Sequence, residues 1–433
     1  MARNEWLGNA QAVKQITTIT IANTWATADT VTVTCNGKTV TVTVGAAAAT
    51  TDVAAALNAA LTGAAAVGTE TRNTTGNLIA EFTEFVSTVS GSVVTLTGVT
   101  AGVPFTATAS ESTAGSGTAT AATPTAATGP NHADNVANWS VGSLPVDTDD
   151  IVIAAPVSIL YGLTALASIA GKLLIYASFW SGGATIGLPK IRRLSGSLSY
   201  NEYRATFLEL DGCTSGSQIG VGGAVGQTPT GSTLLNIDFK TGNVDLTVLR
   251  TGTSNDQSRP ALCLRIVPAD VADAKLEVLG GDVGVGFFGE TNKVLAKVGG
   301  DAKLITGTGV THGATFEQAG GTVEINTATT AITKTGGSLT INGTGAHPIV
   351  DNFGGALVYN STGALGATRV NIGAGASIDF SKDLSAKTVS TALLCAKGAT
   401  VIDPNNAATV KTVGCRLSDI AYTGPMNKTY TAA

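Results

Sequence analysis

The stretch "GGTVEINTATTAITKTGGSLTING", residues 320–343, contains the pattern that decides the fold. Its glycine pairs, Gly320-Gly321 and Gly336-Gly337, each precede a short run in which apolar and polar residues alternate. Alternation with a period of two indicates a strand with one buried face. Glycine supplies the positive φ that a tight corner requires. The stretch therefore predicts short strands separated by sharp turns.

The same pattern recurs along the C-terminal half of the chain. Gly-Gly pairs start at residues 280, 299, 320, 336 and 354, so that successive pairs are 16–21 residues apart. A fixed period of this size is typical of stacked repeats, and no segment here has the long 3.6-residue period of a helical repeat. We therefore expect a parallel β-helix, or β-solenoid, over residues 138–403, with glycine pairs at its corners. A valine at Gly320 or Gly336 should cost more than about 1 kcal/mol, because a β-branched residue resists positive φ.

The segment "NWSVGSLPVDTDDIVIA", residues 138–154, leads into this region. The first coil of a solenoid has an exposed edge that favours aggregation. Trp139 can cover the open end of the core, and "IVIA" can begin the first strand. The residues expected to turn the chain are Gly142 and Pro145, and those expected to accept turn amides or to stay solvated are Asp147, Asp149 and Asp150.

Residues 1–109 predict a mainly β domain with one helix. Two alternating runs flank Asn36-Gly37, the strongest short signal for a hairpin. "TTDVAAALNAALTG", residues 50–63, has a one-faced stripe of Val53, Leu57 and Leu61, with Thr51 or Asp52 as the capping residue and Gly63 as the stop. Further alternating runs follow, so we expect a small N-terminal α+β docking domain.

Two other segments have no apolar period. Residues 110–137 begin with small and polar residues only, which predicts a Gly/Ala/Thr linker arm ordered on a partner. Residues 404–433 are expected to form a C-terminal tail.

Composition excludes several classes of function. Charged residues make up 13% of the 433 residues and the net charge is -5, without a Lys/Arg run, so no nucleic-acid surface is expected. No apolar stretch has the length of a membrane span or of a signal peptide, so we expect no membrane partner and synthesis in the cytoplasm. The five cysteines contain no C-x-x-C, which argues against a disulfide framework or a zinc site. We expect neither a metal nor a cofactor.

Motifs that could support catalysis are weak. "GVGFFG", residues 284–289, matches a dinucleotide fingerprint, but no helix pattern follows it, and turn glycines explain it better. The three histidines share no ligand spacing. Glycan hydrolysis requires two carboxyl groups close together. Glu209 and Asp211 lie two apart on an expected strand and are the nominees if the protein is an enzyme; Asp238 and Asp245 flank a turn.

Aromatic residues are scarce, and two groups of them stand out. Tyr176, Phe179 and Trp180 form one cluster, which is either a glycan platform or part of the core. The other lies in residues 181–210, an expected irregular insertion that mixes aromatic and basic residues. Arg and Tyr are enriched at protein interfaces. The candidate interface residues are Arg192, Arg193, Tyr200, Tyr203 and Arg204, together with Trp6 and Leu7 on a free N-terminal segment.

The whole layout resembles virion structural proteins of tailed bacteriophages. The resemblance rests on the N-terminus "MARNEWLGNAQAVKQ", the "VTVTCNGKTVTVTV" and "TDVAAALNAAL" segments, the Gly/Ala/Thr arm and the β-solenoid. It implies a virion component, often a trimer, such as a capsid decoration protein or a tail or head fibre. Because a solenoid is rigid and carries few charges, we expect a non-enzymatic decoration or cement protein bound to the major capsid protein or to other virion proteins. The alternatives are a receptor-binding tailspike or tail fibre that can depolymerise a glycan, and a bacterial surface adhesin.

Overall fold

The computed structural model describes residues 2–46, 48–73, 79–166, 171–187, 191–195, 198–202, 206–211, 216–222, 232–240, 244–254, 259–266, 274–286, 292–312, 315–425 and 431–432. The chain divides into an α+β unit and a solenoid unit. The α+β unit comprises residues 8–138 and 189–205, and the solenoid unit comprises residues 1–7, 139–188 and 206–433.

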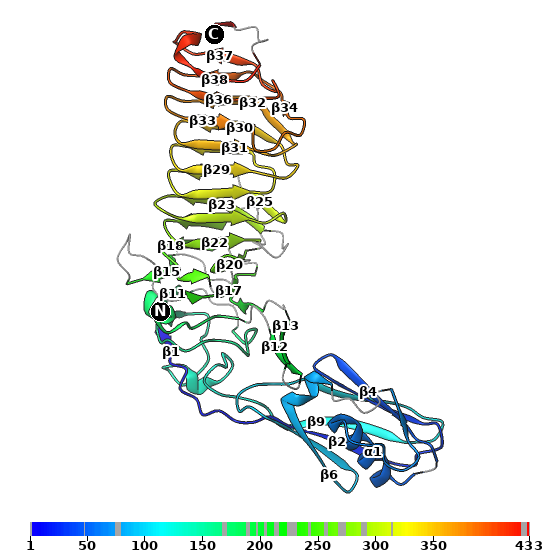
Figure 1. Ribbon diagram of the computed structural model, residues 1–433. Coiled ribbons are helices and arrows are strands. Elements are labelled where there is room, and N and C mark those ends of the chain that lie inside the picture. Colours follow the sequence, from blue (N-terminus) through cyan, green and yellow to red (C-terminus); the bar gives the residue numbers. More distant parts are fainter. Residues whose placement is uncertain are drawn as a thin grey trace. The chain divides into compact units, whose positions relative to one another are not determined.

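Stacked parallel strands build the solenoid unit (Figure 1). In the described part of the chain, one sheet has 16 strands and another has 11. The 16-stranded sheet consists of β1 (Ala2–Trp6), β10 (Asp149–Ile153), β11 (Leu173–Tyr176), β15 (Ser217–Val221), β18 (Asp245–Val248), β21 (Ala274–Val278), β23 (Asn292–Val298), β26 (Phe316–Gln318), β28 (Ala331–Lys334), β30 (His347–Asn352), β32 (Ala364–Ile372), β35 (Leu393–Cys395), β37 (Val410–Thr412) and β39 (Thr431–Ala432), with β25 (Val310–His312) beside β23 and β34 (Thr388–Val389) beside β32.

The 11-stranded sheet forms a second wall of the stack. It consists of β14 (Leu208–Glu209), β17 (Leu235–Asp238), β20 (Leu262–Arg265), β22 (Asp282–Val285), β24 (Lys303–Thr306), β27 (Thr322–Ile325), β29 (Ser338–Ile341), β31 (Ala356–Tyr359), β33 (Ser377–Asp379), β36 (Thr400–Ile402) and β38 (Ala421–Thr423). A short parallel pair, β16 (Ser232–Thr233) and β19 (Thr253–Ser254), and the 3-10 helices η3 (Ala177–Gly182) and η4 (Leu417–Asp419) complete the described elements. The predicted parallel β-solenoid is confirmed.

Register holds the apolar residues in columns inside the stack. Val323 pairs with Leu339, Leu339 with Leu357, and Leu357 with Ile378. All four side chains are completely buried. Because neighbouring strands lie about 4.8 Å apart, each side chain packs on the equivalent one of the next coil, and each contributes roughly 1.5–3 kcal/mol of burial.

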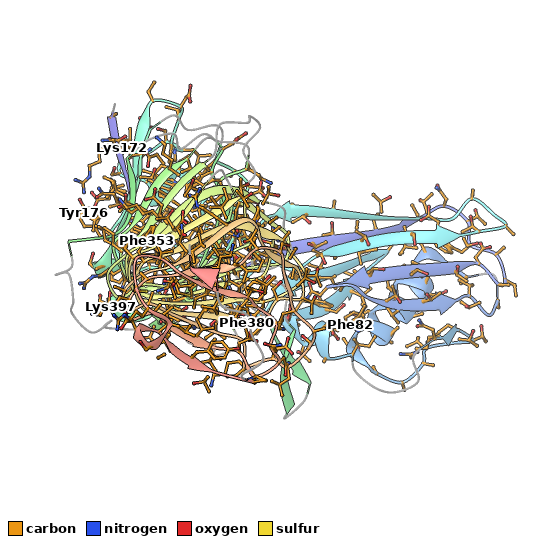
Figure 2. All side chains as sticks on the ribbon, turned by 90° about the horizontal axis from the view of Figure 1, so that it is seen from above. Phe82, Lys172, Tyr176, Phe353, Phe380 and Lys397 are labelled. Carbon is orange, nitrogen blue, oxygen red and sulfur yellow. The ribbon has the colours of Figure 1, made fainter. Side chains whose placement is uncertain are left out.

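Corner positions differ in how much of each side chain they expose. Phe380 follows β33 and is 1% exposed, whereas Phe353 follows β30 and is 51% exposed. Figure 2 looks along the stack and labels both side chains. Large apolar residues therefore occur at the outer corners as well as in the core.

Glycine pairs form the corners, as expected, but the two glycines of a pair have different tasks. The second glycine has positive φ in Gly281, Gly300, Gly321, Gly337 and Gly355. The first glycine does not: Gly320 and Gly336 are needed because the coils approach closely. A Cβ on Gly336 would lie 2.4 Å from the oxygen of Ala319, and one on Gly320 would lie 2.7 Å from the oxygen of Gly300. The expectation that positive φ explains the cost of valine at Gly320 or Gly336 is therefore wrong.

The N-terminal segment is the first strand of the long sheet. β1 runs parallel to β10, with Trp6 opposite Ile153. The Trp6 side chain is completely buried, and its Nε1 donates to the Val157 oxygen at 2.9 Å. The expectation that Trp6 is ordered on a partner is therefore wrong, because its ring is buried within this chain, although Leu7 is 38% exposed.

Trp139 packs at this end of the core, as predicted. Its ring meets the Trp6 ring edge-on, with 5.2 Å between centroids. The segment after Trp139 also covers the outer edge of β1, because Ser140 N donates to the Glu5 oxygen at 2.9 Å and Asn4 Nδ2 donates to the Ser143 oxygen at 3.1 Å. The first of these bonds occupies a backbone oxygen that an open edge would leave available to another chain.

Two of the three acids of this segment accept hydrogen bonds from backbone amides, as predicted. Asp149 Oδ2 accepts from Val146 N at 3.1 Å, and Asp150 Oδ1 accepts from Lys172 N at 2.9 Å. The first bond fixes the turn before β10, and the second ties the start of β10 to the residue before β11.

The stack continues beyond residue 403. β37, β38 and β39 add to the two walls, with β36 pairing β38 and β35 pairing β37. The expected tail at 404–433 is therefore wrong: its strands have only two or three residues each, too few to show a period.

The α+β unit consists of antiparallel sheets with a helix. Its elements are β2 (Ile16–Ala22), β3 (Thr30–Cys35), β4 (Lys38–Thr43), α1 (Thr50–Thr62), β5 (Thr71–Arg72), η1 (Ala80–Glu84), β6 (Phe85–Ser90), β7 (Val93–Gly98), β8 (Ala107–Ser112), β9 (Thr118–Thr125), η2 (Val136–Asn138), β12 (Ile191–Ser195) and β13 (Leu198–Glu202). The strand orders are β6-β7-β2-β9, β5-β4-β3-β8 and β12-β13. The hairpin at Asn36-Gly37 is confirmed, with φ of 50° and 77° at its two turn residues.

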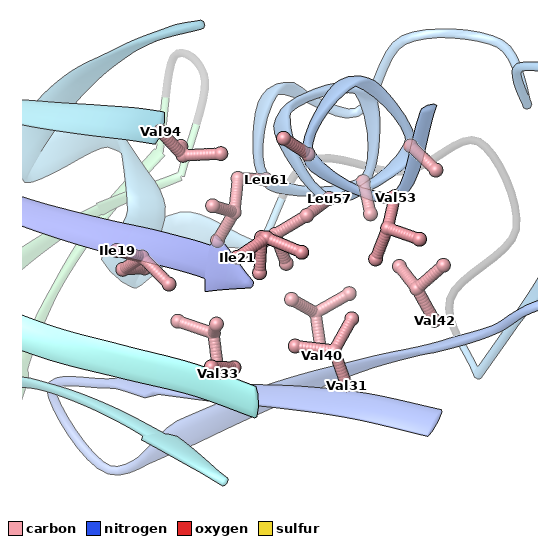
Figure 3. Close-up of a cluster of buried hydrophobic side chains, with 14 of the residues drawn as sticks. Ile19, Ile21, Val31, Val33, Val40, Val42, Val53, Leu57, Leu61 and Val94 are labelled. Carbon is pink, nitrogen blue, oxygen red and sulfur yellow. The ribbon is translucent and has the colours of Figure 1, made fainter. Parts of the chain in front are cut away.

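Helix α1 covers the buried face of these strands (Figure 3). Val53, Leu57 and Leu61 are buried as predicted, and Gly63 ends the helix with φ 67°. Asp52, rather than Thr51, accepts at the N-terminus, from Ala49 N at 3.3 Å.

The expected linker arm belongs to this unit. β8 pairs with β3, and β9 pairs with β2 over residues 118–125. Gly117 packs against the Trp25 ring, where a Cβ would lie 2.7 Å from the ring. Small residues fit here because the large side chains come from Trp25 and β2. The boundary therefore lies near residue 138, and the expected arm at 110–137 is wrong.

Candidate functional site

A cluster of charges lies on the first three strands of the 11-stranded sheet. Glu209 on β14 is opposite Asp238 on β17, which in turn is opposite Arg265 on β20. Lys240 follows β17 with φ 48°. The register thus places two carboxylates and a guanidinium on three consecutive coils. We call these four residues the charge ladder.

The cations hold both carboxylates. Lys240 Nζ lies 2.9 Å from Glu209 Oε1 and 4.0 Å from Asp238 Oδ2, and Arg265 Nη1 lies 3.9 Å from the same Asp238 oxygen. The backbone N of Lys240 donates to Asp238 Oδ1 at 2.8 Å. The Arg265 guanidinium also lies over the Phe207 ring, 3.8 Å from its centroid.

Burial and charge act in opposite directions on Asp238. Burial raises the pKa of this carboxyl, and the Lys240 amide and the two cations oppose that rise. The hydrogen bond from Lys240 to Glu209 raises the pKa of Lys240. The ion pairs from Lys240 to Glu209 and from Arg265 to Asp238 thus link adjacent coils.

The ladder resembles a hydrolytic site in spacing but not in charge. Carboxylates on adjacent coils have the separation of about 5 Å that retaining glycosidases use. An acid–nucleophile pair, however, requires one carboxyl that is protonated and one that is free to attack. Here each carboxylate has a cation beside it. The arrangement is better suited to linking neighbouring coils by ion pairs than to catalysis.

The nominated acids Glu209 and Asp211 do not share a strand. β14 ends at Glu209, and Asp211 lies in the following turn. Asp245 does not join Asp238 either, because it begins β18 in the other sheet. Lys240 and Arg265 could not be predicted from the sequence, because the coils between residues 207 and 265 vary in length and no period aligns these residues.

A shallow hollow of about 240 Å³ lies on the outer face of the 16-stranded sheet. Its charged lining residues are Asp245, Lys275, Glu277, Lys297 and Glu317. Lys297 Nζ lies 3.6 Å from Glu277 Oε1, and both side chains are well exposed. Acids and bases alternate from coil to coil here, so that the hollow favours neither an anion nor a cation.

The first aromatic cluster is part of the core. Phe179 and Trp180 lie on η3 and are 0% and 1% exposed. Their rings therefore cannot form a platform for a sugar. Tyr176, at the end of β11, is partly exposed.

The candidate interface residues of the insertion lie in a hairpin. β12 and β13 are antiparallel, with Arg193 opposite Tyr200 and Arg192 opposite Asn201. The expectation of an irregular segment is therefore wrong for these strands. The backbone of β12 lies beside η1 of the same unit. The side chains of Arg192, Arg193 and Tyr200, and the whole of Tyr203 and Arg204, lie outside the described residues.

Among the described residues, no group of three or more His, Cys, Asp or Glu side chains could hold a metal ion. No described helix is long and apolar enough to cross a membrane.

Two histidines lie inside the stack. His312 and His347 are 8% and 0% exposed, and burial lowers the pKa of each to about 4. Thr329 Oγ1 lies 2.9 Å from His347 Nδ1. His312 packs edge-on against Phe316, and His347 packs in the same way against Tyr359. The two imidazoles are neutral core side chains at pH 7.

No protein-family model matches the chain, and no curated protein shows significant similarity to it.

Proposed function

We propose that this protein is a non-enzymatic structural component of a bacteriophage virion, a decoration or cement protein bound to the major capsid protein. The observation that carries the proposal is the solenoid itself: a continuous parallel stack whose first end is closed by Trp6, Trp139 and the segment over β1. Such a stack is rigid, because its strands are paired on both sides except at its ends.

The charge pattern supports a structural role. The best-placed acids, Glu209 and Asp238, are bound by Lys240 and Arg265. Most of the stack's inward positions are apolar and buried. A surface with few charges and a dense core suits a protein exposed to the medium.

The location in a virion and the capsid protein as partner are inferred from the resemblance in sequence layout. In this proposal the α+β unit docks on the capsid and the protein assembles as a homotrimer. Light scattering on the purified protein tests the trimer; a monomer at micromolar concentration would count against it.

Copy number tests the proposed place in the particle. Particles are purified from the cells that encode the gene, and the chain is quantified by mass spectrometry against the main shell protein. A cement protein is present in a fixed ratio to the shell subunits. A small number of copies at one vertex supports a tail protein instead, and absence from particles overturns the virion proposal.

A receptor-binding tailspike that cleaves a glycan is the second candidate. It is favoured by one observation, the carboxylates of Glu209 and Asp238 on adjacent coils. The test is release of reducing sugar from host polysaccharide by the wild-type protein and by Glu209→Gln. Release that is lost in Glu209→Gln, but kept in a control such as Glu277→Gln, would replace the structural proposal. No release with either protein supports it.

A further inference from the structure

Two cysteines meet across neighbouring coils near the C-terminal end of the stack. Cys395 is the last residue of β35, and Cys415 lies in the corner after β37. β35 and β37 are paired, with Cys395 opposite Thr412. The Cys415 Sγ lies 3.7 Å from the backbone oxygen of Cys395. The thiol of Cys415 is therefore in contact with the residue that carries the other thiol.

The two thiols differ in access. Cys395 is completely buried, whereas Cys415 is partly exposed. Gly414, just before Cys415, has φ 65°, and a Cβ there would meet nothing within 4 Å. The space beside Gly414 is therefore open, while Cys395 is held by the sheet.

We propose that Cys395 and Cys415 form a disulfide bond when the protein meets an oxidising environment, and that this bond fastens β37 to β35. In a reducing compartment both residues remain thiols, as the structure shows them. The bond forms a covalent loop from residue 395 to residue 415 and holds the coil near the end of the stack against fraying.

The reaction with oxidised glutathione has two steps. The Cys415 thiolate attacks one sulfur of the oxidant, a mixed disulfide forms, and one glutathione thiolate leaves and takes up a proton. The Cys395 thiolate then attacks the Cys415 sulfur of the mixed disulfide, and the second glutathione leaves. Two protein thiols are oxidised and one glutathione disulfide is reduced to two thiols.

The second step is the slower one. Burial raises the pKa of the Cys395 thiol to about 12. Little thiolate is therefore present at neutral pH. We expect closure to accelerate at higher pH and in dilute urea, which opens the end coil.

Peptide mapping tests the bond directly. The full-length protein is incubated with oxidised glutathione, alkylated and digested with trypsin. Residues 388–397 and 412–416, which carry the two cysteines, should appear joined, with the loss of two hydrogens. Cys213 is followed separately on the peptide 205–240.

Two variants assign the steps. Cys395→Ala should accumulate the mixed disulfide on Cys415, because nothing resolves it. Cys415→Ser should give neither species on this pair, and circular dichroism equal to that of the parent shows that both variants are folded. Joined peptides that are lost in both variants support the proposal. A folded parent that retains both thiols, or holds only a stable mixed disulfide at Cys415, overturns it.

Discussion

Three alanine variants separate the two tasks of the corner glycines. Gly375 has φ 73° and open space around the position of a Cβ, so that Gly375→Ala tests backbone conformation alone. Gly336 has no positive φ, but its Cβ would lie 2.4 Å from the Ala319 oxygen, so that Gly336→Ala tests the approach of the coils. Gly337 combines φ 70° with a Cβ 2.3 Å from the Gly321 oxygen.

The expected losses of stability follow from these geometries. An L-residue at positive φ costs about 1–2 kcal/mol, and the lower entropy of the unfolded alanine chain returns about 0.4–1 kcal/mol. Gly375→Ala should therefore cost about 1 kcal/mol. Gly336→Ala must push two coils apart, and overpacking of this kind costs about 1–3 kcal/mol. Gly337→Ala carries both costs and should lose about 3 kcal/mol.

Urea unfolding followed by tryptophan fluorescence measures the series, because Trp6, Trp139 and Trp180 lie in the solenoid unit. Long repeat arrays depart from two-state behaviour. The midpoint of the solenoid transition is therefore compared between variants, and hydrogen exchange of β27 and β29 locates the loss.

The order of the three losses of stability shows whether backbone conformation or the approach of the coils requires each glycine. Gly336→Ala with the midpoint of the parent would refute the argument that neighbouring coils leave no room for a Cβ. Equal losses in Gly375→Ala and Gly337→Ala would show that the corner relaxes around the added methyl group and that only φ matters.

Two further predictions concern the core. Trp6→Ala should lower the free energy of unfolding by about 3–5 kcal/mol, because the ring is fully buried. The matched control Leu7→Ala should lower it by less than about 1 kcal/mol. Urea midpoints measure both variants, and equal losses of stability would contradict the burial of Trp6. Burial lowers the pKa of His312 and His347 from 6.5 to about 4. Between these two pH values the unfolded chain binds more protons than the folded chain, so the stability of the folded state should fall as pH drops from about 6.5 towards 4. The expected loss is about 2 kcal/mol per histidine at pH 5. The double variant His312→Leu, His347→Leu should remove this slope between pH 7 and 5, and an unchanged slope would point to other groups.

Short sequence motifs correctly predicted the hairpin and the helix, whose conformations depend on residues close together in the chain. Asn36-Gly37 formed its hairpin and residues 50–62 their helix, since turn residues and an apolar stripe lie within a few positions. The Gly-Gly period predicted the solenoid, because each coil repeats the same corner. The task of the first glycine in each pair, however, depends on the coil beneath it.

Long-range pairing was not predictable. β1 has five residues and pairs with β10, more than a hundred residues away, with no turn to set the register. Trp6 alone could not show whether its burial came from this chain or from a partner. β8 and β9 carry mostly Thr and Ala, so that their period is weak in hydropathy, although Ala119 is buried beside larger side chains.

The contacts of the charge ladder could not be predicted from the sequence either. Glu209 was named for its spacing to Asp211, but its partners are Lys240 and, through register, Asp238. Register across coils of unequal length decides such contacts, and one sequence alone does not reveal where the extra residues of each coil lie.

Inside the stack, polar residues form a column beside the glycine corners. Gln318, Lys334 and Asn352 are successive partners on β26, β28 and β30, and none of them exposes more than 1% of its surface. Each ends its strand and precedes a Gly-Gly pair by two residues.

The corners explain why these residues are polar. A chain that reverses direction through a positive-φ glycine turns some carbonyl groups away from the sheet, and a buried carbonyl requires a donor. Gln318 Nε2, which has two protons to donate, lies within 3.2 Å of three backbone oxygens, and Lys334 Nζ donates to the oxygens of Gly337, at 2.8 Å, and Gly354. Burial lowers the pKa of Lys334 to about 8, and the carbonyl groups take the place of water around its ammonium. The same glycines that bend the coil thus create the need for a donor two residues earlier, and a polar residue before Gly-Gly belongs to the corner rather than to a binding site.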